Sequence, residues 1–135
     1  MKYFKKLYFI YQTRGFRMLH RATRRELIGR LLKYIFKRRF TIINVFNFRL
    51  IVDLCDQGIS RTLWLFGERE LDHKWIMEKT LSKESKVIDI GANIGYYTLI
   101  ESGLIGKEGT ILAVEPSPEN VKLLKKNLDM NGIKQ

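Results

Sequence analysis

The chain has 135 residues, of which 45% are apolar, and a formal net charge of +11. Its length suffices for one domain, and its apolar fraction is ordinary for a globular protein. The single cysteine, Cys55, excludes an internal disulfide. The longest stretch without a charged residue, Ile90 to Ile100, has 11 residues, which excludes a transmembrane helix because spanning takes roughly 20.

The positive charge is concentrated at the N-terminus. Residues 1–40 hold 13 Lys and Arg against a single acid, Glu26, and residues 41–135 hold the other 12 basic residues against 13 acids. The net charges are therefore +12 and −1, so the charge of the whole chain says nothing about the C-terminal part. We expect no signal peptide, since the apolar run LYFIY in this segment is too short. We expect a cytoplasmic protein that can also lie against the membrane.

Residues 1–40 are predicted to form a basic amphipathic helical segment. Apolar residues recur at helical spacing from Leu27 to Ile35, with basic residues between them. A helix of this kind can pack on its own protein or on a partner, lie on an anionic membrane, or contact nucleic acid. Packing is the expectation we favour, followed by a membrane surface, and nucleic acid is the least favoured partner.

Residues 41–84 are predicted to form an adapter. The runs FTIINVFN and FRLIVDL are rich in β-branched and aromatic residues and are joined near Asn47, which predicts a small hairpin. Residues 64–66 form another short apolar element, and residues 70–81 are predicted to be a helix. Residues 82–85 form a loop that leads into a third segment, residues 85–135.

That third segment opens with the string VIDIGANIGYYTL at residues 87–99. Val87 to Ile90 has the composition of a strand buried on both faces of a parallel sheet. Asp89 stands near its end, where open α/β sheets place their ligand crevice. Gly91 and Gly95 bracket a turn into a predicted helix, Tyr96 to Ile105, and glycines let the backbone come close to a ligand.

A second string, ILAVEP at residues 111–116, follows at the distance that a second strand needs. Glu115 ends this strand, and an acid there can accept hydrogen bonds from both hydroxyls of a ribose. Ser117 and Pro118 then start a helix as N-cap and first helical residue, and Asn131-Gly132 ends it. The order is strand, glycine turn, helix, strand, acid and helix, which predicts half of a nucleotide site in an α/β, Rossmann-like fold.

The glycine spacing favours S-adenosylmethionine (SAM) over NAD or FAD. A dinucleotide site needs G-x-G-x-x-G, whose middle glycine admits a pyrophosphate, whereas this chain has GANIG, with Ala92 and Asn93 between its glycines. SAM has no pyrophosphate, but it has a ribose and an ammonium that would suit Asp89.

These strings resemble the opening of the FkbM-type family of SAM-dependent methyltransferases, and DQGISRTLWLFGERE at residues 56–70 resembles the lead-in of that family. The resemblance covers roughly residues 50 to 132 and implies methyl transfer to an oxygen, often a sugar hydroxyl of a glycan or metabolite intermediate. It implies cofactor contacts at Asp89, Gly91, Asn93, Gly95 and Glu115. Glu70 matches a glutamate of the lead-in and is a further candidate.

The chain departs from this family at its C-terminus, because such a domain resembles a seven-stranded sheet and only two of those strands are present. We therefore expect a fold that is incomplete at its C-terminus, with exposed strand edges, and a complementing C-terminal half or homo-oligomer. The residues identify no catalytic base and no metal site. Three alternatives stay open: an O-methyltransferase, a truncated remnant that acts as a membrane- or partner-binding module, and an RNA methyltransferase, which lacks any RNA-specific motif.

Overall fold

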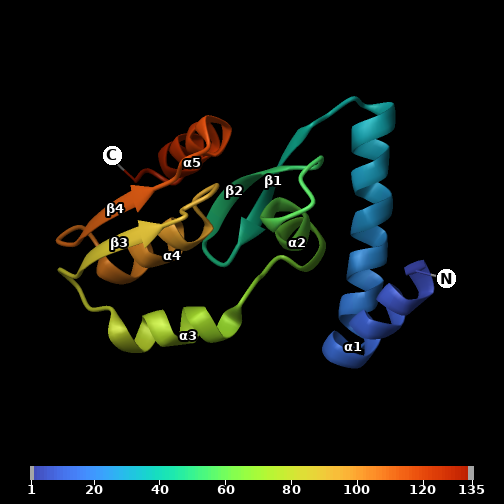
Figure 1. Cartoon of the computed structure of the whole chain (residues 1–135), viewed down its shortest axis with the longest axis horizontal. Helices are drawn as coiled ribbons and strands as arrows, with labels where there is room; N and C mark the ends of the chain where they lie inside the picture. The colour runs from blue at the N-terminus through green and yellow to red at the C-terminus, as the bar shows by residue number, and fades with distance from the viewer. Residues whose placement is uncertain (1, 134–135) are drawn as a thin grey trace. The chain divides into compact units, whose positions relative to one another are not determined.

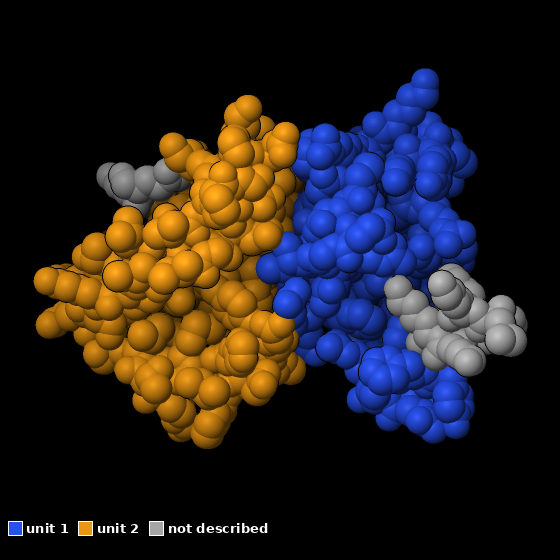
Figure 2. All heavy atoms as spheres, in the orientation of Figure 1, with its two compact units in different colours: residues 1–41, 52–69 blue, residues 42–51, 70–135 orange. Residues whose placement is uncertain are grey.

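The computed structural model describes residues 2–133, and side chains from Tyr8 onward. The secondary structure follows one order along the chain (Figure 1): α1 Lys2–Arg30, the π-helical turn η1 Leu31–Ile35, β1 Phe40–Val45, β2 Phe48–Asp53, α2 Ile59–Phe66, α3 Leu71–Thr80, β3 Lys86–Ile90, α4 Tyr96–Ile105, β4 Thr110–Val114 and α5 Pro118–Met130. Figure 2 colours two compact units, residues 1–41 with 52–69 and residues 42–51 with 70–135.

Unit 1 is built on the long helix α1 and the short helix α2. Gly15 (φ 76°, ψ 174°) breaks α1 into two helical parts, which a glycine permits because it has no side chain to clash. Lys37 (φ 50°) ends the helical segment after η1, and the N–H of Arg38 donates to the carbonyl of Leu32 at 2.9 Å. The predicted basic helical segment is therefore present. Among the described residues, no helix is long and apolar enough to cross a membrane.

The predicted hairpin is confirmed. Its strands β1 and β2 form a two-stranded sheet, and a turn at Phe46 and Asn47 joins them. Val45, Leu50 and Val52 are the most buried side chains of the hairpin. The boundary between the two units runs through it. The sequence divided the chain after residues 40 and 84 on the basis of composition, whereas the two units are defined by compactness. The predicted division therefore stays a prediction.

Unit 2 contains the predicted Rossmann-like strands. β3 and β4 pair in parallel, with Ile88 opposite Leu112 and Ile90 opposite Val114. Side chains alternate between the two faces of a sheet, and one face packs on α4. The opposite face carries Ile88, Ile90, Leu112 and Val114, which are 64%, 82%, 59% and 44% exposed. The composition of Val87 to Ile90 predicted a strand buried on both faces, whereas one face of β3 and β4 is exposed.

The helices of unit 2 agree closely with the sequence patterns. Helix α4 has the predicted bounds, and α3 lies within the predicted range of 70–81. Helix α5 begins at Ser117, whose hydroxyl accepts from the N–H of Asn120, and ends at Asn131, before Gly132 with φ 70°. A groove of about 920 Å³ lies between α4, β4 and α5 and follows β4 from Gly109 to Glu115.

Candidate functional site

The turn between β3 and α4 is fastened to the end of β4. The N–H groups of Gly91 and Ala92 donate to the carbonyl of Val114 at 2.8 and 3.1 Å. Gly91 (φ 82°), Asn93 (φ 51°) and Gly95 (φ 89°) all have left-handed backbone conformations. The turn can therefore be this tight only with residues that tolerate positive φ, which are mainly glycine and asparagine.

The two glycines of this turn differ in their surroundings. A Cβ on Gly95 would lie 2.6 Å from Cδ1 of Leu124, so that glycine is needed for packing against α5. A Cβ on Gly91 would meet no atom within 4 Å. The turn is therefore open at Gly91, at the end of β3, where the sequence placed the ligand.

Glu115 joins the two halves of the predicted site. Its Oε2 accepts from the N–H of Asn93 at 2.9 Å. Its Oε1 accepts from the N–H of Ser117 at 2.9 Å and from Nδ2 of Asn120 at 3.1 Å. The carboxylate therefore fixes the glycine turn, the end of β4 and the start of α5 relative to one another.

These hydrogen bonds also determine the charge of Glu115. Partial burial alone would raise the pKa of its carboxyl, but the hydrogen bonds from Ser117, Asn120 and Asn93 outweigh burial and hold the pKa below its ordinary value. The side chain is therefore ionised at neutral pH. A carboxylate can accept about four hydrogen bonds, so the three donors named here leave it room for one more, on Oε2.

Asp89 lies on the helix side of β3 and is only 8% exposed. Its Oδ2 accepts from the hydroxyl of Thr98, in the first turn of α4, at 2.6 Å. The predicted candidate is thus next to the glycine turn in the chain, but its side chain is directed to α4.

Glu101 is a residue that the sequence reasoning missed. It is 8% exposed, and its Oε2 is buried without a hydrogen-bond partner among the described residues. Burial first, and then the charge of Asp89, raise the pKa of Glu101 to about 7. The available signal was an acid inside the otherwise apolar run Tyr96–Ile105. Asp89 and Glu101 thus form a buried acidic pair beneath the turn.

Glu70, the candidate from the lead-in, lies at the first turn of α4. It precedes α3 with φ 48°, and its Oε2 accepts from the hydroxyl of Tyr97. Nδ1 of His73 is 3.5 Å from the same oxygen and 3.4 Å from the Tyr97 hydroxyl. The three side chains form a half-exposed polar cluster at the start of α4.

Asn127, in α5, is a second residue that the sequence did not single out. It is fully buried, and its Nδ2 donates to the carbonyl of Ile94 in the glycine turn at 2.7 Å. Its Oδ1 accepts from the N–H of Ile51 in β2 at 2.7 Å. The side chain therefore ties the turn to the hairpin strand, and nothing in its sequence context distinguishes it from a surface asparagine.

The structure therefore brings Gly91, Asn93, Gly95 and Glu115 together at one end of β3 and β4, and it sets Asp89 behind them with Glu101. Within the part of the chain that the structure describes, no group of three His, Cys, Asp or Glu side chains could hold a metal ion.

Comparison with known proteins bears on this arrangement. Residues 72–135 match the protein-L-isoaspartate(D-aspartate) O-methyltransferase family. The match covers a little under half of the chain and includes β3, β4 and every residue of the turn. Two curated relatives match over 52 residues, or 38% of this chain: protein-L-isoaspartate O-methyltransferase 1 of Archaeoglobus fulgidus, at 33% identity, and protein-L-isoaspartate O-methyltransferase of Caenorhabditis elegans, at 31%.

The chain spans about a quarter of the length of these relatives, 24% and 23%. A solved structure of a proposed transferase from Pyrococcus horikoshii aligns with 82% of this chain and 44% of its own length, with a TM-score of 0.55 and 15% identity. That likeness shows the fold alone: part of an α/β, Rossmann-like methyltransferase fold, preceded by a long helix and a hairpin.

These matches correct the family that the motifs resembled. They support a methyltransferase relationship for residues 72–135 but give no support to the FkbM-type family or to a sugar acceptor. The reason is physical: the quoted motif residues lie in the β3–α4 turn and at Glu115, and the sequence predicted that they contact the cofactor and not the acceptor. Such residues predict the cofactor chemistry and leave the acceptor undetermined.

Proposed function

We propose that this chain binds SAM at the β3–α4 turn and Glu115 and serves O-methylation. The observation that carries the proposal is the ionised Glu115 carboxylate, joined to Asn93 at 2.9 Å and able to accept a further hydrogen bond. A ribose hydroxyl is a donor of the right kind, and the open side of Gly91 leaves space for the ligand.

The charge of the site favours SAM over a dinucleotide. Asp89, Glu101 and Glu115 are all acids at or beneath the turn, whereas a pyrophosphate is itself an anion and would be repelled. SAM carries an ammonium and a sulfonium. A cation near the Asp89 and Glu101 pair would relieve the repulsion that, together with burial, raises the pKa of Glu101.

The residues of this chain would bind and orient the cofactor. When bound, SAM supplies a methyl group on a positively charged sulfur, which leaves as S-adenosylhomocysteine once an oxygen takes the methyl. Glu115 would hold the ribose, and the turn from Gly91 to Gly95 would approach it with its backbone. The negative charge of Asp89, behind the turn, would favour the ammonium. Holding the two reactants in line accounts for a large part of catalysis in such a displacement.

For the acceptor, we propose a side-chain or main-chain carboxylate of the isoaspartyl type, because the matching relatives bear that activity in their names. A carboxylate is already ionised at neutral pH and can attack without a general base. A sugar hydroxyl would need one.

Calorimetric titration of the purified chain with SAM tests the cofactor proposal. We expect saturable binding by the wild type and by Glu108→Gln, which removes an exposed acid outside the site, and loss of binding by Glu115→Ala. Circular dichroism would verify that each variant folds. No heat at about 1 mM ligand would refute a working SAM site in this chain.

The acceptor is tested separately, with radiolabelled SAM and a peptide that contains one isoaspartyl residue. Base-labile label in the isoaspartyl peptide, and none in the matched aspartyl peptide, is the expected result. Binding of SAM without transfer to either peptide would leave the cofactor proposal standing and reject the acceptor.

A further inference from the structure

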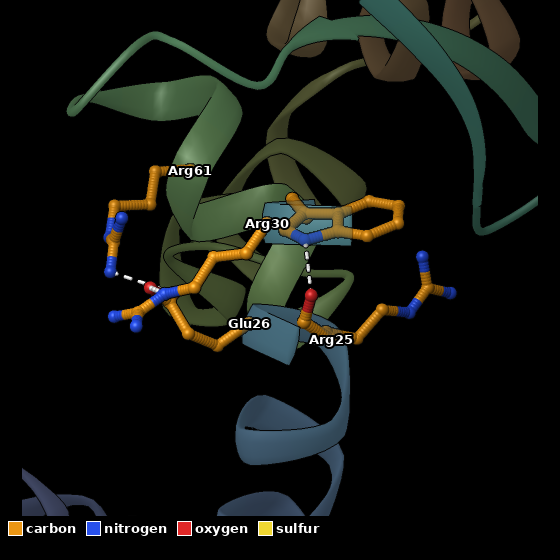
Figure 3. Close-up of polar contacts among 5 residues, drawn as sticks. Arg25, Glu26, Arg30 and Arg61 are labelled. Atoms are coloured by element: carbon orange, nitrogen blue, oxygen red, sulfur yellow. Dashed lines mark hydrogen bonds and ion pairs between the residues drawn. The ribbon is translucent and has the colours of Figure 1, made fainter. Parts of the chain in front are cut away.

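The second half of α1 packs on α2 through small and polar residues. Ala22 is buried, and a Cβ on Gly29 would lie 2.8 Å from Nε1 of Trp64. That nitrogen donates to the carbonyl of Arg25 at 2.9 Å. Figure 3 shows Arg61 and Arg30 meeting Glu26, with Arg61 Nη2 at 2.8 Å from Oε2. Close approach and hydrogen bonds therefore help to hold α1 to α2, while several large apolar side chains near the C-terminal end of the helix stay exposed.

Those large side chains point elsewhere and form what we call the outer stripe. They recur at spacings of one, three and four residues along the end of α1 and through η1, and each is 36–70% exposed: Leu27, Ile28, Leu31, Tyr34, Ile35 and Phe36. Periodicity in the sequence indicated an apolar face and favoured its packing on this protein or on a partner. These side chains are exposed in the structure, so they do not pack on the protein itself.

The surroundings of the outer stripe are almost entirely cationic. Arg24, Arg30, Lys37 and Arg38 are exposed beside it. The single acid of residues 1–40, Glu26, lies on the inner face, paired with Arg61 and Arg30. Burial lowers the pKa of Arg25, and the neighbouring Arg21 and Arg24 lower it further. An anionic partner would relieve this crowding of positive charge.

We propose that the outer stripe is a docking surface for an anionic lipid membrane. A helix that lies at a bilayer surface needs exposed apolar side chains to enter the headgroup boundary and basic side chains to meet anionic lipids. The exposed apolar residues of the outer stripe and the exposed basic residues next to them in the chain supply both. A nucleic acid would use the basic residues but would gain little from aliphatic side chains such as Leu27 and Ile35, which cannot stack on bases as aromatic rings do.

Co-sedimentation of the purified chain with vesicles tests this proposal. The vesicles contain phosphatidylcholine alone or phosphatidylcholine with about one third phosphatidylglycerol, and we expect binding mainly to the second. Replacing Arg24, Lys37 and Arg38 by Gln should weaken the partition coefficient by about fivefold per residue, on the order of a hundredfold together. Replacing Tyr34, Ile35 and Phe36 by Ser should weaken it by a similar factor.

A matched variant, Trp75→Ser with Ile76→Ser, removes two exposed apolar residues of α3 (59% and 50% exposed) and should bind vesicles like the wild type. The proposal would be overturned by a lack of binding to anionic vesicles, or by equal binding of the wild type and the variant with Ser at Tyr34, Ile35 and Phe36. It would also be overturned by a single-stranded RNA that displaces the chain from vesicles and binds the wild type and the Tyr34, Ile35 and Phe36 variant equally tightly. Each is independent of SAM binding.

Discussion

The side-chain amide of Asn127 pairs with both main-chain polar groups of Ile51. Its Oδ1 accepts from the N–H at 2.7 Å, and its Nδ2 lies 3.4 Å from the carbonyl oxygen. One helical turn later, Asn131 pairs in the same way with Arg49, accepting from its N–H at 2.9 Å and donating to its carbonyl at 2.7 Å. The two amides thus continue the hydrogen bonding of β2 on its outer edge, which a neighbouring strand would otherwise satisfy.

Replacing Asn127 by Leu should therefore cost more than its size suggests. The N–H of Ile51 and the carbonyl of Ile94 would lose their partners in a buried place, and each unsatisfied group costs roughly 1–3 kcal/mol. We expect the free energy of unfolding in urea to fall by about 2–4 kcal/mol. Asn131→Ala, at a more exposed position, is the control and should cost about 1 kcal/mol. Equal stability of Asn127→Leu and the wild type would show that the hydrogen bonds of Asn127 do not stabilise the fold.

The side chain of Asn120 should compete with a ribose hydroxyl for the carboxylate of Glu115. Oε1 of Glu115 already accepts hydrogen bonds from Nδ2 of Asn120 and from the N–H of Ser117. Oε2 accepts one from the N–H of Asn93, so one acceptor position remains on Oε2. Both ribose hydroxyls can bind the carboxylate only if the Asn120 amide moves away. Asn120→Ala should consequently retain SAM binding in calorimetry or strengthen it by up to about tenfold. A loss as complete as that of Glu115→Ala would show that Asn120 contacts the cofactor itself.

Local patterns predicted the elements well because local forces determine them. The helix from Tyr96 to Ile105 has the bounds that its apolar spacing indicated, and Ser117 with Pro118 starts α5 as capping rules require. The strands and the turn followed from β-branched runs and from positions that need positive φ. These features depend on residues within a few positions of one another, so one sequence suffices to predict them.

The features that the sequence did not reveal depend on neighbours distant in the chain. The carboxyl of Glu101 is unusual only because α4 packs against both α3 and the β3–β4 sheet, which buries the carboxyl near Asp89. Asn127 matters only because its side chain reaches both β2 and the glycine turn. The sequence pattern indicated the apolar residues of the outer stripe. Their exposure could not be predicted, because α1 packs on α2 through the face that carries Gly29 and Ala22. The acceptor could not be predicted, since the motif residues were expected to contact the cofactor and not the acceptor.

The buried acid makes stability depend on pH. The carboxyl of Glu101 has an ordinary pKa of 4.5 in the unfolded chain and about 7 in the folded one, so the folded state holds the extra proton between these values. The contribution of Glu101 to the free energy of unfolding is therefore greatest below about pH 4.5, and it is lost as the pH rises through about 7. We expect a loss on the order of 2 kcal/mol between pH 5 and 8.

Urea unfolding at pH 5 and pH 8 measures this loss. Glu101→Gln should remove most of it, since the amide has no proton to release and keeps the shape of the side chain. Glu108→Gln, at an exposed position, should keep the pH dependence of the wild type. If Glu101→Gln showed the wild-type dependence, another group would be responsible.

The open position of Gly91 permits a matched test of whether SAM binds at the β3–α4 turn. Gly91 and Gly132 have similar positive φ angles (82° and 70°), and a Cβ on either would meet no atom within 4 Å. Alanine at each position should therefore cost a similar amount of stability, about 1 kcal/mol, from the unfavourable positive φ alone. Only at Gly91 would the added methyl group stand where the backbone approaches the cofactor. Gly91→Ala should weaken SAM binding at least tenfold in calorimetry while Gly132→Ala leaves it unchanged, and equal affinities would place the ligand away from this turn.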